Sequence, residues 1–443
     1  MTTSRLPVYD LSTPRGSADF EQRLNALRAS SSLADSFHAT ADTLIHATQQ
    51  EGDQAIVDHM RQWTDPDFTA DRMRVTDQEL DAAKASLPDE LRGAIERAMD
   101  QVRAYQEHIK PDDAAPITIG GAELGLRFTP ISPVGLLVPG GSAVLFSTLI
   151  MLAIPALVAG VKPGDISVVT PPPYRKAGAP AGDVSPITLA VAQMLGIDKV
   201  YRIGGPPAVA ALAYGTDTVA PVNFIAGPGH PVVQAAKLRL RGIVGTDDYY
   251  GTSEIVVLAD AKANPKHVAS DLIAQAEHDP GKCFLVAWEA RVIEAIQVEI
   301  AKQLPGRARQ DAIAQSLVEA SCAVLVSHQD QALAVVDRLA CEHVNLAVAN
   351  PDAMLAQLQH GGEFFLGDTT PVAAGDYYAG PSHTLPTGTT ARFSSGVSVY
   401  TFLKRSGTVA YRQGMSAQAI DDIARMAQAE GLDGHAASAR VRG

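Results

Sequence analysis

The sequence predicts an α/β protein built from two modules of similar design, each with a parallel sheet covered by helices. From about residue 130, short apolar runs closed by glycine or proline alternate with stretches of helical periodicity. Their spacing of roughly thirty residues is the length of a βαβ unit. Near residue 253 the same alternation starts again. Strands of βαβ units form parallel sheets with both faces buried, so the pattern indicates two Rossmann-like modules with parallel sheets.

The expected strands follow in chain order, with helical stretches between the first three of each module. In the first module they are residues 134–138, 165–170, 199–203 and 223–226. In the second module they are residues 253–259, 283–287, 323–326 and 344–348. The two sets suggest an old duplication, although no residue-level repeat is visible.

The hydrophobic pattern at the two ends of the chain differs from the pattern in the two modules. Residues 1–130 carry mostly helical periodicity with charged outer faces, which indicates a helical N-terminal region, part of it packing on the second module. The first module is expected over 131–245 and the second over 246–385. Residues 386–443 are expected to form a C-terminal helical tail, with a helix that begins after Ser416 as N-cap and ends at Gly431.

Composition narrows the class of protein. The net charge of −13 argues against a nucleic-acid or anionic-membrane partner. Three widely spaced cysteines and an N-terminus without a signal-peptide core indicate a reducing, cytoplasmic compartment. The apolar segment 143–161 contains Pro155 and Gly160, so we interpret it as a buried crossover helix and not as a membrane span.

A helix in the second module carries two residues that could bind a metal. Asn264 and Pro265 are an N-cap and a first-turn proline, and residues 279–281 (Asp-Pro-Gly) end the pattern. Gln275 and His278 lie three residues apart, so they project from one helix face and can offer an amide oxygen and an imidazole to one ion. The alternative is a core histidine beside a polar neighbour.

Three further places carry residues suited to catalysis or metal binding. Glu342 and His343 form an acid–imidazole pair at the start of a strand, which suits proton transfer if the strand is just beginning there. Asp376 and His383 lie on a glycine-rich loop, and Glu430 and His435 flank the end of the last helix. The alternatives are a surface pair, turn chemistry and ordinary capping. A set of Gln, His, Asp and His would suit zinc.

Glycine turns follow two expected strands of the first module. Gly140 and Gly141 follow one strand, and Gly229 follows another. Ligands of α/β sheets bind at such carboxyl ends, so these glycines are the candidate cofactor-binding residues. Because no Gly-x-Gly-x-x-Gly occurs at these turns, they do not by themselves predict a nucleotide site.

Taken together, these motifs resemble the histidinol dehydrogenase family over nearly the whole chain. The resemblance rests on ordered matches at family spacing, which are residues 138–142 (Val-Pro-Gly-Gly-Ser), 227–229 (Gly-Pro-Gly), 253–254 (Ser-Glu), 275–278 (Gln-Ala-Glu-His), 342–343 (Glu-His), 375–376 (Gly-Asp), 383–386 (His-Thr-Leu-Pro) and His435.

The resemblance implies one zinc ion per subunit. Its ligands would be Gln275, His278, Asp376 and His435, and the last would come from the partner subunit of an interwoven homodimer. The helical tail would therefore be exchanged in the dimer.

The resemblance also implies the reaction. L-Histidinol, an amino alcohol, would be oxidised through the aldehyde to L-histidine with two NAD and one water, as a step of histidine biosynthesis. His343 would take the hydroxyl proton and Glu342 would help to activate water. The substrate-binding positions that match are Ser253, Gln275, His278, His343, Asp376, His383, Glu430 and His435.

The chain departs from the family pattern around the dinucleotide. Leu137, Pro207 and His230 stand where the family has tyrosine, glutamine and asparagine, and residues 249–252 (Tyr-Tyr-Gly-Thr) replace Pro-Ala-Gly-Pro. Two alternatives therefore accompany the expected function. One is a paralogous zinc- and NAD-dependent dehydrogenase of another polar alcohol, such as a sulfonated diol. The other is a non-catalytic metal-binding protein.

Overall fold

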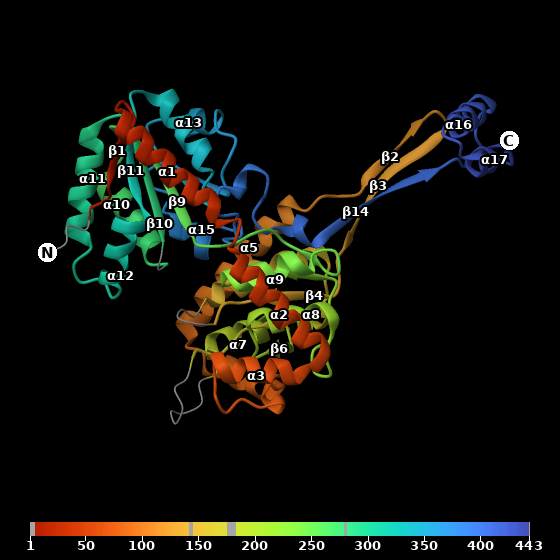
Figure 1. Cartoon of the computed structure of the whole chain (residues 1–443), viewed down its shortest axis with the longest axis horizontal. Helices are drawn as coiled ribbons and strands as arrows, with labels where there is room; N and C mark the ends of the chain where they lie inside the picture. Colours follow the sequence, from red (N-terminus) through yellow and green to blue (C-terminus); the bar gives the residue numbers. More distant parts are fainter. Residues whose placement is uncertain (1–4, 141–144, 175–182, 279–280, 443) are drawn as a thin grey trace.

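A computed structural model describes residues 5–140, 145–174, 183–278 and 281–442. Two α/β modules lie side by side, and a long three-stranded arm projects from them with two helices at its tip (Figure 1). The predicted α/β class with parallel sheets is confirmed. Every predicted strand is present, with bounds that differ by no more than a residue or two.

The first module contains a five-stranded parallel sheet in the order β6-β5-β4-β7-β8. Its strands are β4 (Val134–Leu137), β5 (Ile166–Val169), β6 (Lys199–Tyr201), β7 (Phe224–Ala226) and β8 (Gly245–Thr246). Its helices are α6 (Phe146–Ala159), α7 (Pro186–Met194), α8 (Gly205–Tyr214) and α9 (Pro231–Leu240). Helix α6 is buried along most of its length, as expected for a crossover helix. Within the described residues, no helix is long and apolar enough to cross a membrane.

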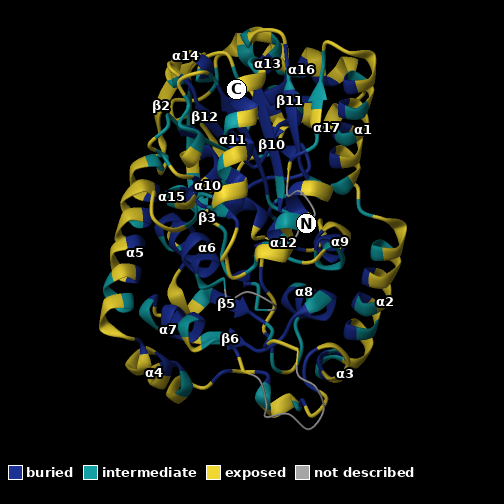
Figure 2. Cartoon of the chain, turned by 90° about the vertical axis from the view of Figure 1, so that its left-hand side faces the viewer, coloured by how far each residue is buried: buried dark blue, intermediate teal, exposed yellow. Residues whose placement is uncertain are grey.

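Four helices of the N-terminal region cover this module. They are α2 (Asp35–Glu51), α3 (Asp53–Trp63), α4 (Asp77–Ser86) and α5 (Asp89–Ile109). Helix α2 packs on α8 and α9, α4 packs on α7, and α5 packs on α6. Their charged outer faces remain exposed while their apolar stripes join the core (Figure 2).

The second module contains a six-stranded parallel sheet in the order β1-β11-β10-β9-β12-β13. Its strands are β1 (Val8–Asp10), β9 (Glu254–Ala259), β10 (Lys282–Ala287), β11 (Cys322–Leu325), β12 (His343–Ala347) and β13 (Glu363–Leu366). Its helices are α10 (Pro265–Ala276), α11 (Ala290–Gln303), α12 (Gln310–Gln315), α13 (Gln329–Leu339), α14 (Pro351–Leu355) and α15 (Val372–Tyr377). Strand β1 comes from the N-terminus, and α1 (Pro14–Ser30) buries Phe20, Leu24 and Leu27 against the same module. The N-terminal region is thus shared between both modules.

The two modules have the same strand order. If the strands of each module are numbered from β4 and from β9, both sheets run 3-2-1-4-5, and β1 adds one edge strand to the second. This is the doubly wound order. All strands are parallel, but the direction in which successive strands are added across the sheet reverses between the third and fourth strands, so that the first and fourth are neighbours. The shared order supports the two-module interpretation at the level of topology.

The arm contains three strands that were not predicted from the sequence. Strands β2 (Ala114–Ile119), β3 (Ala122–Pro130) and β14 (Leu403–Ala410) pair antiparallel, although residues 114–130 were assigned to a mostly helical N-terminal region and residues 403–410 to a helical tail. Every residue of β2 is exposed, and β14 is almost entirely exposed. Strands with both faces in solvent lack the alternating apolar pattern on which sequence prediction depends.

The C-terminal helices form the tip of the arm. Helix α16 (Ala417–Ala429) begins after Ser416, whose hydroxyl accepts the Ala419 N–H as the predicted N-cap. Helix α17 (Asp433–Arg440) packs against it. Both helices lie far from the two modules of the same chain (Figure 1).

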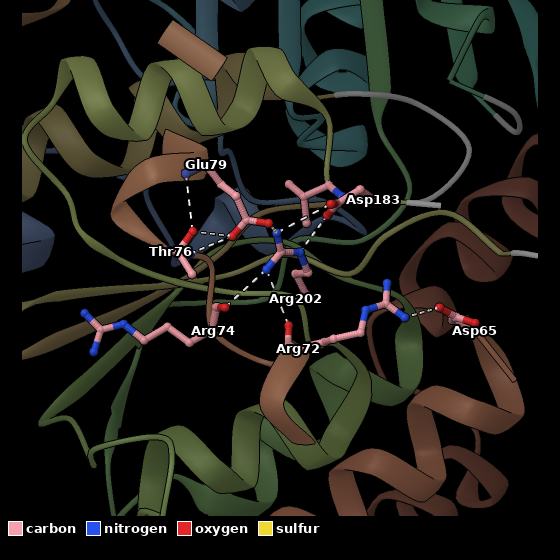
Figure 3. Close-up of polar contacts among 8 residues, drawn as sticks. Asp65, Arg72, Arg74, Thr76, Glu79, Asp183 and Arg202 are labelled. Carbon is pink, nitrogen blue, oxygen red and sulfur yellow. Dashed lines mark hydrogen bonds and ion pairs between the residues drawn. The ribbon is translucent and has the colours of Figure 1, made fainter. Parts of the chain in front are cut away.

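A buried arginine links the edge of the first sheet to its surroundings. Arg202 follows β6 and donates to Glu79 and Asp183, each at 2.6 Å, and to the carbonyl oxygens of Arg72 and Arg74 (Figure 3). Each donor of a planar guanidinium needs a partner when buried, and here two carboxylates and two carbonyls supply them. This cluster fixes the sheet edge to α4 and to the N-terminal chain.

Candidate active site

A cavity of about 510 Å³ lies where the two modules meet. The first module contributes Pro139, which follows β4, and Thr148, which belongs to α6. It also contributes Pro228–His230, which follow β7. From the second module it is lined by residues at the amino ends of β9 and β12 and by the loop after α15. The carboxyl edge of the first sheet therefore faces the amino edge of the second, and this volume suits a small ligand.

The end of α10 places Gln275 and His278 beside this cavity. The helix begins as predicted, because Asn264 Oδ1 accepts the Lys266 N–H at 3.1 Å. It ends at Ala276, two residues before His278, but the His278 N–H still donates to the Gln275 carbonyl at 3.3 Å. One turn therefore brings both side chains to the same side. His278 lines the cavity, and its pKa is lowered by burial and by Arg309.

Gln275 is part of a hydrogen-bonded chain that leads to Glu342. Its Nε2 donates to Ser253 Oγ at 2.6 Å, and that hydroxyl donates to Glu342 Oε2 at 2.6 Å. The Glu254 N–H donates to the same carboxyl oxygen at 2.9 Å. The direction of this chain fixes the amide, so Gln275 Oε1 remains available as an acceptor or metal ligand.

Glu342 and His343 both line the cavity because β12 begins at His343. The strand alternation that would send adjacent side chains to opposite faces does not yet apply there. The His343 ring lies between two carboxyl groups, with Nδ1 3.8 Å from Glu342 Oε2 and Nε2 3.8 Å from Asp376 Oδ1. Within the described part of the chain, neither ring nitrogen has a hydrogen-bond partner.

Burial shifts the acid–base properties of this group. It lowers the pKa of His343 to about 3, with a further contribution from His278 and His383. It raises the pKa of Glu342 well above the ordinary value, although the bonds from Ser253 and the Glu254 N–H oppose the shift. Burial also raises the pKa of Asp376 to about 6. The imidazole is therefore neutral near pH 7 and has one unprotonated ring nitrogen, although a pKa this low makes it a weaker base than an exposed histidine.

The loop after α15 brings His383 into the same cavity. His383 Nδ1 lies 2.8 Å from the Asp376 carbonyl oxygen, so this nitrogen carries the proton. Its Nε2 then accepts from Thr148 Oγ1 at 3.1 Å. Thr148 was not among the predicted site residues, because a threonine inside an apolar helical segment carries no sequence signal for a site.

Two predicted site residues lie elsewhere in the chain. Glu430 is the C-cap of α16 and His435 belongs to α17, both at the tip of the arm and both exposed. The structure of one chain thus gathers Ser253, Gln275, His278, Glu342, His343, Asp376 and His383, and leaves Glu430 and His435 remote (Figure 1).

The predicted cofactor-binding glycines follow the strands of the first sheet. Gly140 packs closely, since a Cβ there would lie 1.9 Å from the Pro171 carbonyl oxygen, and Gly229 lines the cavity. Gly141 lies outside the described residues. Leu137 is buried in the core and Pro207 is buried in the first turn of α8, whereas His230 is exposed in the cavity wall.

The donor set fits zinc in part. In the described residues no group of three or more histidine, cysteine, aspartate or glutamate side chains is arranged to hold a metal. Gln275, His278 and Asp376 carry the oxygen and nitrogen donors that zinc accepts, and a four-coordinate zinc site made from them would need a fourth ligand.

Two modules of doubly wound order meet at a cavity that holds an imidazole beside a carboxyl, an arrangement typical of α/β enzymes. The family profile described as histidinol dehydrogenase matches residues 27–443. The chain belongs to the histidinol dehydrogenase family, whose members are oxidoreductases.

Individual relatives agree with this assignment. The histidinol dehydrogenase of Caulobacter vibrioides is 42% identical over 400 residues, which is 90% of this chain and 91% of that protein. The histidinol dehydrogenase of Agrobacterium fabrum is 39% identical over 430 residues, covering 97% and 98% of the two chains. The crystal structure of histidinol dehydrogenase from Elizabethkingia anophelis superposes with a TM-score of 0.88 at 30% identity, covering 99% of this chain and 98% of the other.

Proposed function

We propose that this protein oxidises L-histidinol to L-histidine through histidinal, using zinc and two NAD, as the last oxidation of histidine biosynthesis in the cytoplasm. The observation that carries the proposal is the neutral His343 imidazole held between Glu342 and Asp376 in the cavity between the modules. Family membership supports the substrate, and the donor set described above supports the metal.

The chain's own residues account for the proton transfers. In the first oxidation His343 Nε2, which faces Asp376, takes the hydroxyl proton of the alcohol as hydride leaves its carbon. In the second oxidation Glu342 takes a proton from the water that adds to the aldehyde. Its raised pKa makes the carboxylate a better base near neutral pH than an exposed glutamate. The hydrogen bond from Ser253 holds this carboxyl in place.

Binding and orientation depend on the remaining site residues. Gln275, His278 and Asp376 would hold the zinc together with His435 of a second copy. When bound, zinc would fix the imidazole and amine of the substrate, and NAD would accept the hydride. Glu430 at the arm tip suits a cationic amine. Because both oxidations would take place in the same cavity, the aldehyde would not have to be released between them.

The arm supports a homodimer that exchanges its tails. It carries Glu430 and His435 away from the modules of their own chain, while the three candidate ligands at the cavity still need a fourth (Figure 1). A second copy of the chain would place its arm tip over this cavity, so the active dimer would contain two shared sites.

A steady-state assay tests the proposal. With L-histidinol and NAD we expect two NADH per substrate, loss of turnover after chelation and recovery on adding zinc. L-Histidinal should also be oxidised. Absence of turnover with zinc present and with either NAD or NADP would rule the function out.

The second candidate is a dehydrogenase of another polar alcohol. The observation in its favour is the loss of the usual side chains at Leu137, Pro207 and His230, together with the altered segment 249–252, part of which lines the cavity. A panel with L-histidinol, 2,3-dihydroxypropane-1-sulfonate and simple diols separates the two. A kcat/KM for histidinol above that of every other alcohol removes this alternative.

A further inference from the structure

A turn in the cavity wall begins at Gly227, directly after β7. Its φ is +125°, and a Cβ at this position would lie 2.4 Å from the Leu137 carbonyl oxygen, so only glycine fits. The next three residues, Pro228–His230, line the cavity on the side of the first module. The position of this wall therefore depends on how Gly227 is held.

A buried ion pair holds both polar backbone groups of Gly227. The Gly227 N–H donates to Asp247 Oδ2 at 2.5 Å, and the Gly227 carbonyl accepts from Lys237 Nζ at 2.9 Å. Lys237 and Asp247 also form a direct ion pair, and their side chains are only 2% and 1% exposed. Burying two charges gains little stability, because desolvation offsets their attraction. What the arrangement does provide is a fixed orientation of one peptide turn.

The same lysine also fixes the segment that connects the modules. Lys237 Nζ donates to the Asp248 carbonyl at 3.2 Å and lies 5.2 Å from the centre of the Tyr250 ring. Tyr250, Gly251 and Thr252 line the cavity, and the segment ends at Ser253. Lys237 thus contacts both the turn and the connecting segment, and each of these two segments lines the cavity.

We infer that Lys237 and Asp247 are positioning residues for the dinucleotide, acting through the Gly227–His230 turn. The inference rests on the proposed function. Leu137 and Pro207 both have hydrocarbon side chains and both are buried, so neither can offer a polar side chain to a cofactor. The backbone of the turn therefore has to supply more of the contact with the cofactor. Such a contact contributes more to the binding affinity when the turn is already held in one conformation, because less ordering is then needed on binding.

The decisive variant replaces Lys237→Gln and Asp247→Asn together, which removes both charges and leaves no unpaired ion in the core. In the zinc-loaded protein we expect the KM and the dissociation constant for NAD to rise about tenfold or more, the size expected for lost charge-assisted hydrogen bonds. Zinc content and the KM for L-histidinol should stay within about twofold of wild type. The single variant Lys237→Arg, which keeps the positive charge, should retain most of the wild-type affinity for NAD.

A partly buried ion pair away from the cavity serves as the control. Arg72 and Asp65 pair at 2.7 Å in the N-terminal region that covers the same module (Figure 3). The double variant Arg72→Gln with Asp65→Asn should lower the melting temperature without changing the KM for NAD. An unchanged NAD affinity in the folded Lys237/Asp247 double variant overturns the inference.

Two further outcomes of this experiment can be distinguished from each other. If the double variant does not fold, Asp247→Glu becomes decisive, because it keeps both charges and moves the carboxyl that accepts the Gly227 N–H by one methylene. Wild-type NAD affinity in that folded variant also overturns the inference. Failure of the wild-type protein to bind NAD contradicts the proposed function instead.

Discussion

Thr148 Oγ1 donates a hydrogen bond to His383 Nε2 at 3.1 Å and so connects α6 of the first module to the loop after α15 of the second. The other ring nitrogen of His383 donates to the Asp376 carbonyl, so both nitrogens are engaged and the tautomer is fixed. Both residues line the cavity in which the substrate is proposed to bind.

Replacing Thr148→Val keeps the shape of the side chain and removes this hydrogen bond. Because a hydrogen bond of this kind contributes about 1 kcal/mol, the KM for L-histidinol should rise about fivefold. Thr148→Ser keeps the hydroxyl and is the matched control, with a KM close to wild type. A valine variant that behaves like the serine variant would show that His383 needs no partner on α6.

Substitutions of His343 and of Glu342 should each slow a different one of the two oxidations. His343→Asn should lower kcat for L-histidinol by about 10²–10⁴, the usual contribution of a general base. Glu342→Gln keeps an acceptor for Ser253 and should slow the oxidation of histidinal more than that of histidinol. Single-turnover measurements with each substrate separate the two steps. Equal losses in both steps for Glu342→Gln would contradict its assigned role, and zinc content provides the control for an intact site.

Glu254 predicts a pH dependence of stability. It is fully buried, and burial raises its pKa to about 7 despite Lys282 at 3.9 Å. A carboxyl whose pKa is raised by folding binds its proton more tightly in the folded state. Its contribution is therefore complete below the unfolded pKa and is lost as the pH rises to about 7. Replacing Glu254→Gln removes this loss, while the amide oxygen can still accept the Gly388 N–H.

The free energy of unfolding measures this difference. Between pH 5 and 7 the variant should gain on the wild type by about 1 kcal/mol per pH unit at most. Urea unfolding at several pH values gives the comparison, and Glu96→Gln, an exposed glutamate on α5, should show no such gain. A difference between Glu254→Gln and wild type that is independent of pH would mean that Glu254 does not titrate in this range.

Subunit mixing tests whether the arm completes a neighbouring site. His343→Asn and His435→Ala are each expected to be inactive alone. If tails are exchanged, a mixed dimer contains one site with a native His343 from one chain and a native His435 from the other, so co-refolding should restore activity. Two identically mutated chains mixed in the same way are the control. Lack of recovery in dimers proven to be mixed would place His435 in the site of its own chain.

The strands that could be predicted are those buried on both faces. The runs around Val134–Leu137 and Glu254–Ala259 are continuous and apolar, since each lies in the middle of its sheet, and such runs leave a clear trace in the sequence. The arm strand Ala114–Ile119 leaves none, because all its residues face solvent. Burial, which produces the pattern, is absent there.

The residues of the candidate site also divide into those that the sequence could bring together and those that it could not. Gln275 and His278 could be placed together because one helical turn joins them, and that spacing is visible in the sequence. Thr148 and His383 are brought together only by the packing of two modules, to which no local pattern corresponds. Family resemblance, not periodicity, connected the first pair to Asp376 and His435.

The shared 3-2-1-4-5 strand order has a consequence for how the molecule could have evolved. The first sheet meets the cavity with its carboxyl edge, while the second meets it with its amino edge. The second module therefore does not present to the cavity the edge at which folds of this kind ordinarily hold their ligands, and Glu342 and His343 lie at its opposite edge. Under the proposed function, one module would hold the cofactor and the other the acid–base residues, so exchanging the two would not restore a working enzyme.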